Sequence, residues 1–128
     1  MVGWGGLPNL TEFNPQGQMI FDAQLPRGEF SYRVYRLPWH GQPSEAPQIA
    51  AKATASATAV YASWNGATDV ASWQLLTGAT SAHLTPVSTT PRSGFETVIP
   101  APHAAFFQVR ALSPAGSVLA TSGVVAPS

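Results

Sequence analysis

The stretch VYASWNGATDVASWQLLTG, Val60–Gly78, decides the fold. Every second residue from Val60 to Trp64 is apolar, which is the period of a strand with one buried face. Asn65–Gly66 is a turn dipeptide, and the alternation returns over Ala71–Leu75. Two strands separated by a turn are therefore predicted here, with Trp64 and Trp73 in the core.

The same pattern continues on both sides of this stretch. The run FFQVRALSPAGSVLATS, Phe106–Ser122, repeats the alternation around a Pro-Gly turn. Twelve Pro and eleven Gly punctuate short runs rich in β-branched and aromatic residues. The Ala-rich segment Ala50–Ala59 has no amphipathic face at helical spacing, so it is predicted as a strand and a turn. Residues 48–128 thus predict a seven-stranded sandwich, and no helix is required.

Composition excludes several classes of function. Of 128 residues 45% are hydrophobic and only 9% charged, and the six basic and six acidic residues balance. No basic patch for nucleic acid or an anionic membrane surface is predicted. The chain has no Cys, so disulfides, thiolate metal sites and cysteine nucleophiles are excluded, and no cofactor is expected. No membrane span and no signal-peptide pattern is recognised in this sequence.

Residues 1–40 predict a separate four-stranded antiparallel sheet. A turn is expected at Asn14–Gly17, where Pro and Gly supply the required dihedral angles. The four predicted strands are Val2–Trp4, Asn9–Phe13, Gln18–Ala23 and Tyr32–Leu37.

These four strands carry apolar side chains on both faces, so both faces need cover. A segment of this size is at the lower limit for independent folding. We therefore expect protein partners, either further sheets of the same kind or a second copy. The Pro-rich segment GQPSEAP, residues 41–47, is predicted as a linker to the sandwich.

The strand motifs together resemble a known family. WNGATDVASWQLLTG and FFQVRALSPAGSVLATS are similar to strands of fibronectin-III domains. Joined to VGWGGLPNLTEFNPQGQMIFDAQLP, SYRVYRLPW and PRSGFETVI, they resemble the C-terminal part of arylsulfotransferase-like proteins, over essentially the whole chain. The resemblance implies a last propeller blade followed by a fibronectin-III-like, immunoglobulin-like sandwich.

The resemblance also implies a function and a location. In that family a histidine near the propeller axis accepts the sulfuryl group, and the catalytic histidines and arginine lie in other blades. This chain would then be a non-catalytic part that braces the propeller or mediates interaction, in a bacterial protein at the cell surface or outside the cell. His40, His83 and His103 match no catalytic motif and are given no role.

Three sets of candidate site residues follow for the N-terminal segment. Arg33 and Arg36, on an aromatic strand, are candidate contacts for an anion such as sulfate, with pairing to Glu or Asp as the more common role. Glu12 and Asp22 could face each other across the first hairpin, but a carboxylate pair on neighbouring strands is usually solvated or bonded to Arg and is not expected to act in glycosidase-type catalysis. The candidate interface residues are Trp4, Phe13, Phe21, Tyr32 and Tyr35.

Two other functions stay open. An autonomous fibronectin-III-like module would bind carbohydrate, an aryl ligand or protein through exposed aromatic residues, Trp4 and Trp39 among them. A component that itself transfers sulfuryl groups would need a complete active site, which no motif in this sequence supplies.

Overall fold

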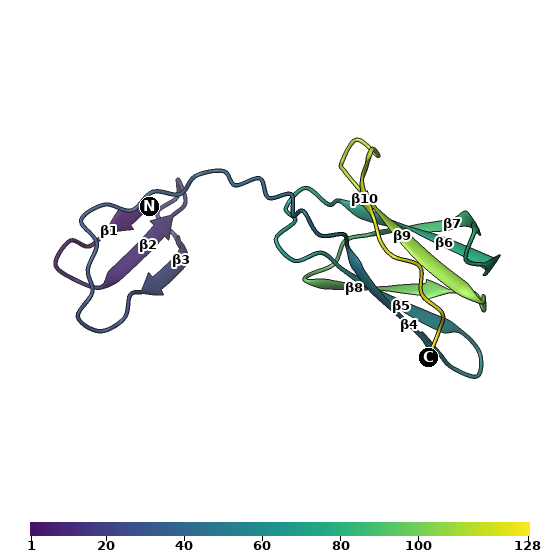
Figure 1. The fold of residues 1–128 in the computed structure, drawn as a ribbon. Helices are drawn as coiled ribbons and strands as arrows, with labels where there is room; N and C mark the ends of the chain where they lie inside the picture. Colours follow the sequence, from purple (N-terminus) through teal and green to yellow (C-terminus); the bar gives the residue numbers. More distant parts are fainter. The chain divides into compact units, whose positions relative to one another are not determined.

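The computed structural model describes all 128 residues as an all-β chain in two compact units, 1–38 and 39–128 (Figure 1). Ten strands form three antiparallel sheets. The all-β class is thus confirmed. The layout differs from the predicted four plus seven strands in its first part: the N-terminal sheet holds three strands, whereas the second unit holds seven, in sheets of three and four. No element is a helix with the length and apolarity that a membrane crossing requires.

The N-terminal unit is a small sheet with the strand order β1-β2-β3. Its strands are β1 (Val2–Gly3), β2 (Asn9–Phe13) and β3 (Met19–Gln24). The predicted turn joins β2 to β3: the Asn14 side-chain oxygen accepts the N–H groups of Gln16 and Gln18, at 3.0 and 2.9 Å. Gly17 ends the turn with a φ of 76°, a backbone conformation that residues with a side chain rarely adopt.

The predicted fourth strand, Tyr32–Leu37, does not form. Instead the segment crosses one face of the sheet. A Cβ added to Gly3 of β1 would come 3.1 Å from Val34, and Arg36 pairs with Glu12 of the central strand. A chain lying over the face cannot also pair with the edge. Val34 is therefore turned toward the sheet and its neighbours are turned to solvent, so bulky side chains on both sides of this segment do not require a strand.

The second unit is a sandwich of two sheets (Figure 1). The first sheet has the order β4-β5-β8, with β4 (Gln48–Ala53), β5 (Thr58–Ser63) and β8 (Glu96–Ala101). The second has the order β10-β9-β6-β7, with β6 (Ser72–Thr80), β7 (His83–Pro91), β9 (Phe106–Leu112) and β10 (Val118–Thr121). The Ala-rich segment forms β4, a turn and the start of β5, as predicted.

The core lies between the inner faces of these sheets, and strand alternation explains its membership. Every second residue of β5 and β8 is buried, as are the matching residues of β6 and β9. Trp73 and Phe107 are its largest fully buried side chains. The Trp73 indole N–H donates to Thr97 Oγ1 at 3.2 Å, so its polar atom is satisfied inside the core. The predicted burial of both Trp64 and Trp73 is confirmed.

The segment predicted as a linker, residues 41–47, packs on the sandwich. Pro47 is fully buried, and the Glu45 carbonyl accepts the Trp64 indole N–H at 2.7 Å. The division between the compact units falls earlier, between Pro38 and Trp39. These contacts make residues 41–47 part of the second unit.

Replacing Trp73 by Ala should lower the free energy of unfolding of the sandwich by about 3 to 5 kcal/mol, because it empties a buried aromatic site. Trp39→Ala is the matched control: Trp39 is 78% exposed against 1% for Trp73, so its loss should cost less than about 0.5 kcal/mol. Urea unfolding followed by circular dichroism measures both. Equal stability of the two variants would show that Trp73 does not hold the sheets together.

Candidate functional site

The candidate interface residues all lie in the N-terminal unit, and all are exposed. The exposed fractions are 48% for Trp4, 41% for Phe13, 46% for Phe21, 82% for Tyr32 and 71% for Tyr35. A unit of 38 residues rarely leaves so many aromatic side chains in water, because each buries a large area when it is covered. The unit is therefore the first place to look for a binding surface.

These residues do not form one patch. Paired residues of antiparallel strands share a face of the sheet, and the register pairs Thr11 with Asp22 but Glu12 with Phe21. Trp4 lies with Thr11 and Asp22, whereas Phe21 lies on the opposite face, where Tyr35 of the crossing segment also lies. The sheet thus offers two separate aromatic surfaces.

A chain of hydrogen bonds orders the first surface. The Trp4 indole N–H donates to Thr11 Oγ1 at 2.8 Å, and the Thr11 hydroxyl donates to the Asp22 carboxylate at 2.9 Å. Thr11 is buried beneath them, at 4% exposed. This relay fixes the indole ring against the sheet while leaving about half of it in solvent, which suits a flat aromatic contact.

The second surface surrounds a hollow of about 440 Å³ on the opposite face. Leu10, Phe21, Val34 and Tyr35 line it, so it is mostly apolar. Arg36 and Glu12 form an ion pair at its rim, and the Arg36 side chain is 67% exposed. An exposed ion pair adds little to the free energy of unfolding. It does join the crossing segment to the central strand of the sheet.

The candidate anion contacts have other partners. Arg36 is paired with the Glu12 carboxylate. The Arg33 guanidinium lies 5.3 Å from the centre of the Tyr32 ring, a cation–π distance. Pairing of Arg36 with an acidic residue was the more common role expected from the sequence.

Glu12 and Asp22 do not face each other. They lie on opposite faces of the sheet, because the register places Asp22 beside Thr11 and Glu12 beside Phe21. Two carboxylates on opposite faces cannot act together on one bond. The strand pattern does not determine the register of the hairpin, and a shift of one residue reverses which side chains share a face.

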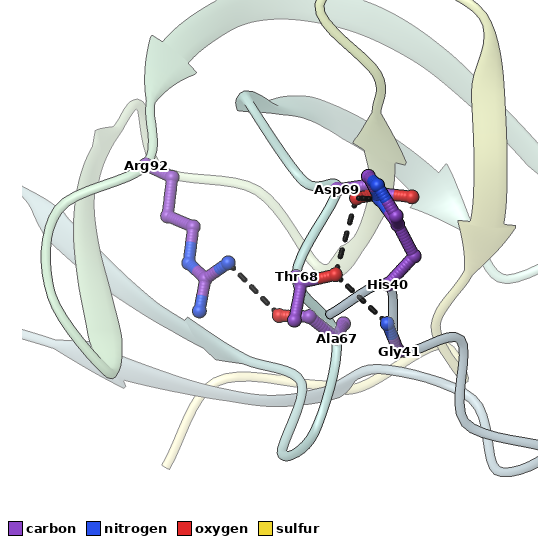
Figure 2. A network of polar contacts seen from close by, with 6 residues as sticks. All are labelled: His40, Gly41, Ala67, Thr68, Asp69 and Arg92. Carbon is purple, nitrogen blue, oxygen red and sulfur yellow. Dashed lines mark hydrogen bonds and ion pairs between the residues drawn. The ribbon is translucent and has the colours of Figure 1, made fainter. Parts of the chain in front are cut away.

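The second unit holds a polar network at its start (Figure 2). His40 Nδ1 lies 3.0 Å from the Asp69 carboxylate. The Gly41 N–H donates to Thr68 Oγ1 at 2.8 Å, and the Thr68 hydroxyl donates to Asp69 at 3.1 Å. On the other side of the loop the Arg92 guanidinium donates to the Ala67 carbonyl at 3.0 Å (Figure 2).

The hydrogen bond from His40, and then that from Thr68, lowers the pKa of the Asp69 carboxyl below its usual value. A lowered pKa stabilises the folded state at pH values above the ordinary pKa of aspartate. This contribution to the free energy of unfolding is lost as the pH falls through the lowered pKa. Because Asp69 is exposed, solvent weakens the effect. The network therefore connects residues 40–41 to the loop before β6 by hydrogen bonds.

The other two histidines lie elsewhere, His83 at the start of β7 and His103 in the loop before β9. No group of three or more His, Asp or Glu side chains is placed to hold a metal ion. Sequence reasoning missed Thr68, Asp69 and Arg92. Spacing could not reveal them, because 29 positions separate His40 from Asp69 and 25 separate Ala67 from Arg92.

Comparison of the sequence with protein-family models gives no match, and neither the curated proteins nor the solved structures contain a match.

Gly41→Ala should destabilise the second unit by about 1 to 3 kcal/mol, because the new Cβ would lie 2.2 Å from the Gly66 carbonyl oxygen, a backbone atom. Gly123→Ala is the control, since its Cβ would meet nothing within 4 Å. Thermal unfolding of both variants tests this close approach. If Gly41→Ala unfolds at the parent temperature, residue 41 is not fastened to the loop.

Proposed function

We propose that the chain is a non-catalytic C-terminal part of an arylsulfotransferase-like protein. In this proposal the N-terminal sheet is a propeller blade that packs on neighbouring blades, and the fibronectin-III-like sandwich braces the propeller or mediates interaction. The resemblance of the strand motifs supplies the family. The protein would work at the bacterial cell surface or outside the cell.

One observation carries the interaction role: the N-terminal sheet exposes aromatic side chains on both faces, whereas the sandwich closes its own core. Phe21 on one face and Trp4 on the other are each about half exposed, at 46% and 48%. Within the sandwich, Trp73 and Phe107 are fully buried. Propeller blades are sheets packed face to face around an axis, so a blade taken alone has two uncovered faces.

The strand order supports the fibronectin-III-like part of the proposal. The sandwich has sheets of three and four strands, and the chain passes between the sheets after β5, β7 and β8. This connectivity is typical of immunoglobulin-like sandwiches. The core Trp73 on β6, facing the sheet of β5, fits the buried aromatic residue of that architecture.

The non-catalytic role agrees with what the polar side chains do. Transfer of a sulfuryl group needs several fixed donors aimed at one charged centre. Arg36 is paired with Glu12, and His40 is paired with Asp69 in the other unit. Arg36 and His40 each have a partner within their own unit.

A second candidate, an autonomous module for carbohydrate, an aryl ligand or protein, rests on Trp39 and Trp4. Trp39 is 78% exposed, and the Trp4 ring is held by its hydrogen bond to Thr11. Trp64 and Trp73 are buried and cannot take part. This module would bind a glycan array through Trp39 or Trp4.

The purified chain should not transfer sulfate from 4-nitrophenyl sulfate to phenol. It should co-elute with an arylsulfotransferase-like propeller from which the corresponding C-terminal blade and sandwich have been deleted. Phe21→Ser should weaken that complex at least tenfold, since it removes an exposed aromatic contact. Val87→Ser is the matched control, because Val87 on β7 has the same exposed fraction of 46%.

Three results would contradict the proposal: turnover by the chain alone, no complex with the deleted propeller, or equal weakening by both substitutions. Binding to a glycan array that is lost in Trp39→Ala would favour the second candidate.

A further inference from the structure

We propose that β3 is an interface strand whose free edge pairs, antiparallel, with β3 of a second copy of this chain about a two-fold axis at Ala23. The inference concerns the edge of the N-terminal sheet, whereas the proposed function concerns its faces. It stands without the arylsulfotransferase-like assignment.

The four edges of the sandwich are each covered or interrupted. The C-terminus lies along β4, where Ser128 exchanges backbone hydrogen bonds with Ala51 and Ala53 at 3.0 and 3.1 Å. The edge strands β7 and β8 contain Pro86 and Pro100, which lack a backbone donor. β10 has four residues and a register shift. These are the devices that keep edges from pairing with other chains.

β3 lacks such cover. It is an edge strand with no Pro, Lys or Arg, and Phe21–Gln24 pair regularly with Asn9–Glu12 of β2. A register shift at Ile20 limits the regular stretch at one end only. The other edge of this sheet, β1, has two residues. Phe21–Gln24 is therefore a regular edge stretch that no Pro, basic side chain or covering segment protects.

Two backbone hydrogen bonds of this sheet show which backbone groups of β3 point outward. The Leu25 N–H donates to the Pro8 carbonyl at 2.7 Å, so the backbone of Leu25 faces β2. The Trp4 N–H donates to the Asn9 carbonyl at 3.2 Å, so the backbone of Asn9 faces β1, away from its partner Gln24. Because these orientations alternate along a strand, the N–H and C=O groups of Asp22 and Gln24 point away from the sheet.

This alternation and the side chains select one register. With the axis at Ala23, Asp22 lies opposite Gln24 of the second copy, so both residues exchange backbone hydrogen bonds and an amide meets a carboxylate. Phe21 then lies opposite Leu25 of the second copy, an apolar pair. An axis at Asp22 would place two carboxylates opposite each other, and an axis at Phe21 would place Asp22 opposite Ile20.

A second copy fits this edge because an extended strand pairs with all of its outward groups at once and the Asp22–Gln24 pair is formed twice by symmetry. The N-terminal unit also needs such support. Units below about 40 residues usually depend on disulfides, metals or oligomerisation, and this chain has no Cys. Edge pairing would join two sheets of three strands into one of six.

A cysteine-free chain allows a direct test with Ala23→Cys. Directly opposed residues of this kind lie about 4.5 Å apart between Cα atoms, which a disulfide can span. Under mild oxidation, Ala23→Cys should form a covalent dimer at least tenfold faster than Val87→Cys, an exposed position on the Pro-containing edge strand β7. Equal rates for the two variants would overturn the proposal.

Gln24→Pro removes an outward N–H that β2 does not use, so the sheet should keep its fold. The parent chain should sediment at twice the 13.4 kDa monomer mass at about 100 μM, and Gln24→Pro as a monomer. A monomeric parent, or a Gln24→Pro variant that dimerises as well as the parent, would overturn the edge pairing. Neither result affects the complex with a deleted propeller, so the two proposals fail separately.

Discussion

The contact between the two inner faces of the sandwich is the interaction on which the second unit depends. A sheet with one apolar face must cover it, and here β5 and β8 supply one face while β6 and β9 supply the other. Trp73 fills the space between them and bonds to Thr97 across the core. The packed core gives the rest of the unit a rigid surface to contact. The loops, His40 near the start of the unit and the C-terminal Ser128 all form hydrogen bonds to other residues of the unit.

The N-terminal sheet lacks this kind of closure. The crossing segment covers part of one face through Val34 and Arg36, but Trp4 and Phe21 remain about half exposed on opposite faces. Its β3 edge carries outward backbone groups without a neighbouring strand. Uncovered faces and a free edge are different surfaces, so the partners proposed for the faces and for the edge would not compete for the same atoms.

Strand alternation predicted most of the sandwich because it reports burial directly. The buried positions at Val60, Trp64 and Trp73 follow from a period of two in the sequence. The predicted strand Tyr32–Leu37 rested on bulky side chains on both sides of the segment, which a segment lying on a sheet face can also carry. The opposite faces of Glu12 and Asp22, and the pairing of His40 with Asp69, depend on register and on distant loops, which sequence spacing does not encode.

Hydrogen exchange followed residue by residue, as a function of chain concentration, tests most directly whether the sandwich is complete and the N-terminal sheet is not. Amides of β5, β6 and β9 should be protected at every concentration, whereas those of β2 and β3 should exchange quickly in dilute solution and become protected as the chain associates. Protection of β2 and β3 that equals that of the sandwich and does not change with concentration would contradict this account.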